Sequence, residues 1–194
     1  MRLACSRIVV GFQESLQRFP PARARPFLDA RPAVACADAR PPLWSSRRSV
    51  VIRVLAVGKL KDRRLIALAD DYRRRLRSST TLREVELRDQ DPGREGRRML
   101  DQLAPPGGHE RVIALDERGD QLTSRELARV LGDHGSIAFL IGGADGLSDA
   151  VRDRADQLLS LSRLTFPHEL ARILLLEQIY RGFSILRGSP YHRD

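Results

Sequence analysis

Three short segments with the composition of a ligand-binding site each follow an apolar run in the sequence. They are residues 115–119 (LDERG), 141–146 (IGGADG) and 161–166 (LSRLTF). In open α/β sheets, ligands bind beyond the carboxyl ends of the strands, and glycine there lets a ligand approach the backbone. We therefore expect a small-molecule site where these segments meet, although a glycine turn after a strand is by itself more often structural.

The glycine pattern of the second segment excludes two common nucleotide-binding motifs. Gly142-Gly143-x-x-Gly146 is neither the dinucleotide fingerprint G-x-G-x-x-G nor a phosphate loop ending in Gly-Lys-Ser/Thr. The chain's two cysteines, Cys5 and Cys36, both precede residue 50, so the rest of the sequence holds no disulfide framework, metal-ligand spacing or thiol nucleophile. This cysteine usage fits a reducing, cytoplasmic setting.

The elements that must position these segments alternate regularly from residue 50 onward. β-Branched apolar runs predict strands, and apolar residues at helical spacing predict amphipathic helices. The expected strands are residues 50–57, 81–87, 111–115, 136–141 and 157–161. The expected helices are residues 62–77, 93–103, 123–132, 148–155 and 167–186, with Thr123 or Ser124 as the cap of the third. This alternation predicts an α/β fold with a largely parallel sheet covered by helices on both faces.

Residues 1–49 differ in composition from the rest of the chain. They hold nine Arg against three acidic residues, a net charge of +6, whereas residues 50–194 hold 25 Lys plus Arg against 22 Asp plus Glu, a net +3. Six prolines interrupt every candidate element, so we expect a disordered Arg/Pro/Ala-rich extension before one folded domain of residues 50–194. A transit peptide, or translation that begins near Val50, is an alternative interpretation. The near-neutral body makes charge weak support for nucleic-acid binding, and no apolar run approaches the ~20 residues of a membrane helix.

Three stretches of the sequence resemble a known family. FLIGGADGLS, LSLSRLTFPHELARILLLEQIYRGFSILRGSPYHRD and IRVLAVGKLKD are similar to segments of the RlmH family of SPOUT methyltransferases, which modify N3 of a pseudouridine in 23S ribosomal RNA. The resemblance covers residues 50–194 nearly completely and does not extend to residues 1–49. It implies a trefoil-knotted fold with S-adenosylmethionine bound in the knot, a homodimer, and 23S rRNA as the partner, with no metal.

The resemblance also implies which residues form the site. The cofactor contacts fall on Leu115, Gly142, Leu161, Ser162, Arg163, Leu164, Thr165 and Phe166. The catalytic candidates are His168, Arg172, Tyr191, His192 and Arg193. The proton on N3 must leave during methyl transfer, and histidine can accept a proton near neutrality. Arginine can instead hold a phosphate or an anionic base oxygen.

Simpler interpretations of these candidates stay open at the level of sequence. His168 also fits a solvated or capping histidine, Arg172 an ion pair with Glu169 or another acidic neighbour, and residues 191–194 a frayed end. Residues 167–186 are apolar around most of the helix, which predicts burial by the core on one side and by a second subunit on the other. Two rival functions are an RNA-binding SPOUT protein without catalysis and a nucleotide-binding oxidoreductase, the latter disfavoured by the missing fingerprint.

Overall fold

The computed structural model describes residues 50–193, which form one five-stranded sheet. Its strands are β1 (Val50–Val57), β2 (Thr80–Leu87), β3 (Glu110–Gln121), β4 (Ser136–Ile141) and β5 (Gln157–Ser160). They lie in the order β2-β1-β4-β3-β5, and every neighbouring pair is parallel. The predicted α/β class is confirmed. The trefoil knot stays a prediction, and the expected extension of residues 1–49 lies outside the described residues.

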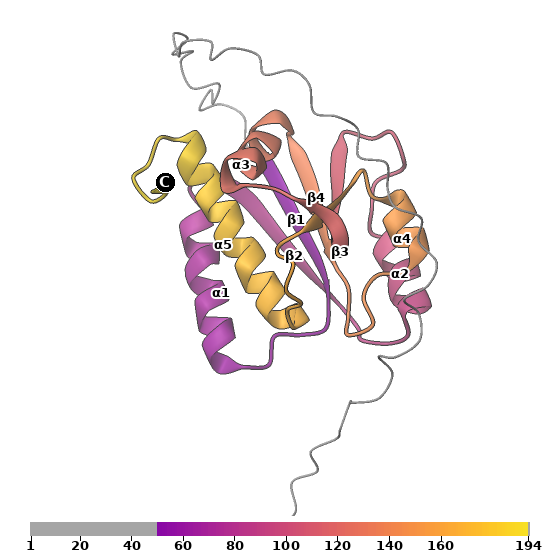
Figure 1. Cartoon of the computed structure of the whole chain (residues 1–194). Coiled ribbons are helices and arrows are strands. Elements are labelled where there is room, and N and C mark those ends of the chain that lie inside the picture. Colours follow the sequence, from indigo (N-terminus) through magenta and orange to yellow (C-terminus); the bar gives the residue numbers. More distant parts are fainter. Residues whose placement is uncertain (1–49, 194) are drawn as a thin grey trace, which may run out of the picture. The chain divides into compact units, whose positions relative to one another are not determined.

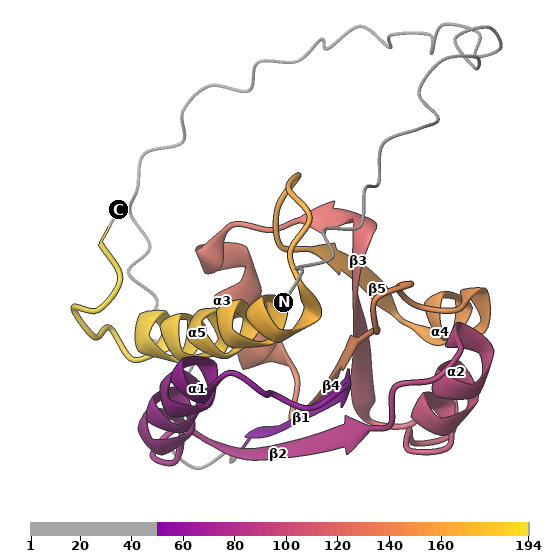
Figure 2. The same cartoon turned by 90° about the horizontal axis from the view of Figure 1, so that it is seen from below.

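Five helices cover the two faces of this sheet between residues 50 and 193 (Figure 1, Figure 2). The helices α1 (Arg63–Leu76), α3 (Ser124–Asp133) and α5 (His168–Leu186) lie on one face, and α2 (Pro92–Leu100) and α4 (Asp149–Arg154) lie on the other. Parallel strands require crossover connections, which is why a helix separates each strand from the next. None of the described helices is both long and apolar enough to cross a membrane.

The central strands are apolar on both faces because each face meets a layer of helices. Ile52 of β1 belongs to the same core cluster as Phe183 of α5. On the opposite face of β1, Leu55 belongs to a second core cluster, which includes Met99 of α2. All four side chains are at most 1% exposed. Successive strand residues point to opposite faces, so a strand covered twice reads as a continuous apolar run.

Local hydrogen bonds determine where the helices begin and end. Thr123, and not Ser124, caps α3: its side chain accepts the N–H of Glu126, whose carboxylate accepts the Thr123 N–H in return. The helix α2 ends at Leu100, three residues earlier than predicted. The backbone N–H groups of residues 102 and 103 instead donate at 3.0–3.1 Å to the carbonyls three residues earlier. This spacing forms a tighter turn than the four-residue spacing of an α-helix.

The third strand is longer than predicted: the expected strand ended at residue 115, whereas β3 runs to Gln121. The strand continues through residues 115–119 with a register shift, so that both Leu115 and Asp120 pair with Leu159 of β5. A Cβ on Gly119 would lie 2.5 Å from backbone atoms of β5. A bulge accommodates extra residues without ending a strand, and glycine permits the close approach of the two backbones.

Candidate functional site

The pairing of β3, β4 and β5 brings the predicted segments to one edge of the sheet. Ile141 pairs with Leu115, and Leu115 pairs with Leu159. Ile141, Leu115 and Leu159 thus lie side by side across three strands. Gly142 comes one residue after Ile141, and residues 161–166 begin two residues after Leu159. This is the carboxyl edge of the strands, where open α/β sheets bind ligands. The structure thus brings together the residues predicted to contact a cofactor.

The turn after β4 folds back on its own backbone. Gly143 and Gly146 form an isolated antiparallel bridge, in which the Gly146 N–H donates to the Gly143 oxygen at 3.2 Å. A Cβ on Gly142 would lie 2.6 Å from the carbonyl carbon of Gly146. The glycine at position 142 was predicted to make room for a ligand, but the loop's own backbone fills the space where its Cβ would lie. Glycine at this position therefore lets the turn close tightly on itself.

An ion pair fixes β3 beside Leu115. Asp116 accepts the N–H of Arg118 at 2.9 Å and the guanidinium Nε–H of Arg152, on α4, at 2.7 Å. Burial by itself would raise the pKa of the Asp116 carboxyl, but these donors outweigh burial and hold the pKa below its ordinary value. The carboxylate consequently stays charged at neutral pH and ties β3 to α4 next to the predicted site.

Residues 161–166 form an exposed loop between β5 and α5. The Ser160 hydroxyl donates to the Ser162 oxygen at 2.8 Å, and the Leu164 N–H donates to the Ser162 hydroxyl at 3.0 Å. Leu164 is 73% exposed, an unusual position for a leucine in a folded domain. The exposed neighbours are Arg163 and Thr165, and the partly buried ones are Leu161, Ser162 and Phe166. The loop therefore offers an apolar side chain and backbone polar groups to a ligand.

The first turn of α5 packs on the loop that follows β1. A Cβ on Gly58, whose φ is +82°, would lie 2.9 Å from Nε2 of His168. The Lys61 N–H donates to Glu169 Oε2 at 2.9 Å. His168 is partly buried, and its imidazole makes no hydrogen bond or ion pair with residues 50–193. The capping interpretation is not supported, because no side chain caps α5.

Arg172 is held by carboxylates of β2. It is 3% exposed, and it donates to Glu84 Oε2 through Nε at 2.8 Å and Nη2 at 2.6 Å. Its Nη1 donates to Glu86 Oε1 at 2.9 Å, and Arg73 of α1 also bonds to Glu84. The partners are therefore acidic residues distant in sequence, not Glu169. A guanidinium engaged by two carboxylates ties α5 to the edge strand, which favours a structural role over a catalytic one.

The tail after α5 folds back on that helix. The Tyr191 hydroxyl donates to Glu177 Oε1 at 3.1 Å, and its ring meets that of Tyr180 edge-on with centroids 4.8 Å apart. The guanidinium carbon of Arg181 lies 5.0 Å from the Tyr191 ring centroid, and its Nη1 lies 3.5 Å from His192 Nδ1. Burial, with the neighbouring tyrosine and carboxylate groups, raises the pKa of the Tyr191 phenol. Tyr191 and His192 are thus packed, contrary to the frayed-end interpretation.

The tail lies far from the predicted cofactor loop within one chain. Glu177, which binds Tyr191, is nine residues after His168, or about 13 Å along the helix axis. Figure 1 shows the tail beyond the end of α5 that is opposite the carboxyl ends of the strands. Arg193 is exposed beside it. Because reacting atoms must come within about 3–3.5 Å, one chain in this conformation does not bring the predicted catalytic tail to the predicted cofactor loop.

Glu95, a residue of α2 that packs on the glycine turn, was not predicted from the sequence. It is 4% exposed, and its Oε1 accepts the Gln90 N–H at 2.7 Å. A Cβ on Gly143 would lie 3.1 Å from Oε2 of Glu95. Burial raises the pKa of this carboxyl, and the nearby Asp89 and Asp145 raise it further. The feature of the sequence that could have indicated a special role for Glu95 is that it is the acidic residue of an otherwise Arg-rich helix, PGREGRRML.

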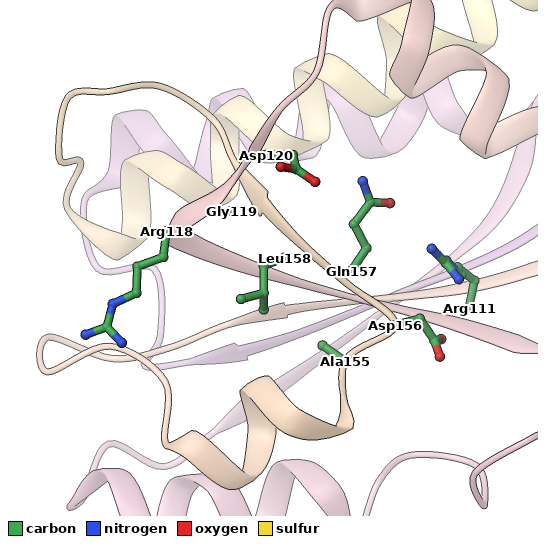
Figure 3. A pocket seen from close by; sticks show the side chains of 8 residues that line it. All are labelled: Arg111, Arg118, Gly119, Asp120, Ala155, Asp156, Gln157 and Leu158. Carbon is green, nitrogen blue, oxygen red and sulfur yellow. The ribbon is translucent and has the colours of Figure 1, made fainter. Parts of the chain in front are cut away.

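A separate open groove of about 580 Å³ runs along β3 and β5 (Figure 3). Arg118 and Arg111 stand at its two ends, with Asp120 and Gln157 between them. None of the residues predicted to contact a cofactor lines this groove. Its charges are mixed, so it does not select for ligands of one sign.

The chemistry at the carboxyl edge suits noncovalent binding of a small organic molecule. The edge offers backbone groups of the glycine turn, apolar side chains and one imidazole. Within residues 50–193, no three His, Cys, Asp or Glu side chains are placed to hold a metal ion. Fold and site together define an α/β protein with a compact glycine turn at the carboxyl edge of its parallel sheet, where ligands bind in this class of fold.

Comparison with known proteins identifies the family. Residues 50–192 match the family model described as "Predicted SPOUT methyltransferase". A curated relative, the "Ribosomal RNA large subunit methyltransferase H" of Synechococcus sp. (strain RCC307), is 47% identical over 145 residues, 74% of this chain and 95% of the relative. Proteins of the same name from Geobacter metallireducens and Rhodospirillum centenum are 44% and 47% identical over 155 and 147 residues. These matches cover 74% and 71% of this chain and 99% and 95% of the relatives. The chain belongs to the SPOUT methyltransferase family, as the resemblance predicted.

Proposed function

We propose that this protein transfers the methyl group of S-adenosylmethionine to large-subunit ribosomal RNA, at N3 of a pseudouridine in the 23S molecule. The supporting observation is the strand register that gathers Leu115, Gly142 and residues 161–166 at one edge, in a chain of a methyltransferase family. The relatives' name supports the choice of large-subunit RNA. The choice of pseudouridine N3 rests on the resemblance described above.

The residues at this edge fit a cofactor that is partly apolar and positively charged. Leu115 and Leu164 offer apolar contacts, and the loop backbone offers donors and acceptors for an adenine edge. Asp89 and Asp145 lie near Glu95 beside the glycine turn, so acidic groups gather there, which suits a sulfonium cation better than an anion. S-Adenosylmethionine bound here supplies an activated methyl group. The chain's own residues must position the RNA base and remove its proton.

The working unit in this proposal is a homodimer in which the tail of one chain completes the site of the other. Tyr191 and His192 pack on the half of α5 that is remote from their own cofactor loop. Ile66, Leu68 and Leu170, on α1 and α5, are 36–41% exposed and offer apolar surface that a second copy would cover. Two copies of α5 packed antiparallel would bring each tail to the start of the partner's helix.

The tail then contributes three kinds of chemistry to the reaction. His192 accepts the proton of N3, since histidine titrates near neutrality. Tyr191, whose raised pKa keeps its phenol protonated, donates a hydrogen bond or stacks on the base. Arg193 is exposed and pairs with a phosphate or with the base oxygen that gains negative charge. His168, at the cofactor edge, is the second candidate for the base.

Mass spectrometry of ribosomal RNA from a deletion strain tests the assignment. We expect one methyl group to disappear from a 23S pseudouridine and to return when the gene is restored. Unchanged methylation in the deletion strain would refute the proposal. Calorimetry with S-adenosylmethionine separates an enzyme from a non-catalytic RNA-binding protein, because the latter releases no heat of cofactor binding.

Mixing two variants tests the shared site, at an S-adenosylmethionine concentration that loads the wild-type cofactor loop but is too low to load a Gly142→Ala chain. One chain lacks residues 191–194 and keeps its cofactor loop, and the other carries Gly142→Ala and keeps its tail. If the tail acts on the partner's site, random exchange restores about a quarter of wild-type activity, since half the dimers hold one complete site of two. If the tail acts within its own chain, the mixture stays inactive.

A further inference from the structure

The chain has two lysines, and both lie in the loop that follows β1. Of 34 Lys plus Arg residues, Lys59 and Lys61 are the lysines, separated by Leu60. Both are exposed, whereas Leu60 is partly buried and packs against the core. Neither lysine side chain makes a hydrogen bond or ion pair with any residue that the structure describes. Two unpaired ammonium groups therefore project from one short loop.

Many of the arginines are used differently. Arg152 and Arg172 bind carboxylates at 2.6–2.9 Å, and Arg181 binds Glu177 at 2.5 Å. Planar guanidinium groups suit such fixed, bidentate contacts within the protein. A lysine is a compact charge on a flexible stem, which suits contact with phosphates whose position varies.

The lysine loop is fixed at both ends beside the proposed cofactor site. At its start, the Gly58 N–H donates to the Leu87 oxygen at 2.9 Å, and Gly58 packs under His168. At its end, the backbone of Lys61 is held by Glu169. The backbone of the loop is thus held at both ends, while both lysine side chains are exposed to solvent.

The position of β1 in the sheet puts these charges close to the glycine turn. Ala56 of β1 pairs with Ile141 of β4, so the two strands end side by side. A Cβ on Gly143 would lie 3.1 Å from Cγ1 of Val57. Lys59 is two residues beyond Val57, a chain length of at most about 7 Å. A polyanion that presents a base to the glycine turn would pass over this loop.

We propose that Lys59 and Lys61 bind phosphates of the RNA next to the nucleotide that is methylated. This inference rests on the proposed function and deepens it by assigning the RNA-binding surface. The body of residues 50–194 has a net charge of only +3, so a general electrostatic field contributes little to RNA affinity. Local, unpaired cations at the mouth of the site supply the attraction where it is needed.

Besides RNA, S-adenosylmethionine also carries an anionic group, its carboxylate, that these lysines could contact. The exposure of both side chains favours the larger and outer ligand, because a lysine that held the cofactor would be enclosed with it. A cationic sulfonium also gains nothing from added positive charge nearby. The two ligands predict different outcomes in the same variant.

The first test is Lys59→Ala/Lys61→Ala, with Arg97→Ala/Arg98→Ala as the matched control. Arg97 and Arg98 are also an exposed pair of cations close together in the chain, on α2, and their side chains make no hydrogen bond or ion pair with residues 50–193. Methyl transfer to purified large subunits that lack the modification is measured at several salt concentrations. We expect the lysine variant to lose at least tenfold in kcat/KM for RNA. The slope of log affinity against log salt should fall by about 1.4–1.8, or 0.7–0.9 per phosphate.

The affinity of the lysine variant for S-adenosylmethionine is measured by calorimetry. We expect it to equal that of the wild type, and the arginine control to match the wild type in every assay. Loss of cofactor affinity with an unchanged salt slope would overturn the proposal and assign the lysines to the cofactor carboxylate. An unchanged RNA affinity and salt slope would overturn it as well.

Amine footprinting provides a readout that does not depend on catalysis. Because the chain has two lysines, acylation of Lys59 and Lys61 can be followed site by site with mass spectrometry. We expect bound large subunits to protect both sites, and free S-adenosylmethionine to protect neither. Protection without methyl transfer would leave this surface assignment standing while the proposed function failed, so the two can be told apart.

Discussion

Replacement of Arg172 by alanine separates a structural role from a catalytic one. The side chain is 3% exposed and donates three hydrogen bonds to Glu84 and Glu86. Its loss leaves the Glu84 carboxylate, whose side chain is 10% exposed, with Arg73 as its remaining cation. Breaking a buried ion pair from one side costs about 3–5 kcal/mol. The remaining pair with Arg73 places the expected loss near the lower end, at about 3 kcal/mol.

The contact with Glu86 adds little to this figure, because the Glu86 side chain is 35% exposed and water screens the pair. For a domain of this size, about 3 kcal/mol lowers Tm by roughly 6–12 °C. The assay is thermal unfolding by circular dichroism, with Arg77→Ala as control. Arg77 is exposed, and its side chain makes no hydrogen bond or ion pair with the residues that the structure describes. We expect the control to unfold within about 1–2 °C of the wild type.

The pH dependence provides a second check on the same residue. Burial alone would raise the pKa of Glu84, but Arg73 and Arg172 outweigh burial and lower it below the reference value of 4.5. A lowered carboxylate pKa contributes stability above that reference value, and the contribution is lost as the pH falls through the folded-state pKa. The difference in Tm between variant and wild type should therefore be full at pH 7 and shrink in acid below pH 4.5. A variant with wild-type Tm but no methyl transfer would refute the structural role and return Arg172 to the catalytic candidates.

Four further predictions follow from particular contacts. Gly142→Ala should weaken S-adenosylmethionine binding at least tenfold in calorimetry, because its Cβ would meet the turn's own backbone at 2.6 Å. Gly135→Ala, with no atom within 4 Å of its Cβ, is the control and should bind normally. Because the pKa of Glu95 is raised, the wild type should lose stability as the pH rises above 4.5 and this carboxyl ionises. Glu95→Gln cannot ionise, so its Tm should not show this fall; Tm measured against pH checks it. Deletion of residues 191–194 should abolish single-turnover methyl transfer while cofactor affinity is kept, and undiminished turnover would transfer the base's role to His168. A chain that starts at Val50 should keep the wild-type Tm and cofactor affinity, and a clear loss of either would show that residues 1–49 contribute to the fold.

The sequence by itself determined the order and type of the elements. Apolar runs and helical spacing are local signals, so all five strands and all five helices of residues 50–193 were predicted, most within two residues of their ends. The capping box at Thr123 was readable for the same reason, because its two partners are three residues apart. The motifs around Gly142 and residues 161–166 also sufficed to identify the family, which the comparisons confirmed.

Only the tertiary structure decided which residues meet across long stretches of chain. Arg172 finds Glu84 at a separation of 88 residues, and Glu95 reaches the glycine turn from α2. The length of β3 depends on how closely the backbone of Gly119 can approach β5. The spacing of apolar residues in the sequence does not indicate this contact. The tail's distance from the cofactor loop depends on the length of α5 and on its contact with Glu177. Periodicity specifies which face of an element is buried, but the partner on that face is chosen by the packing of the whole fold.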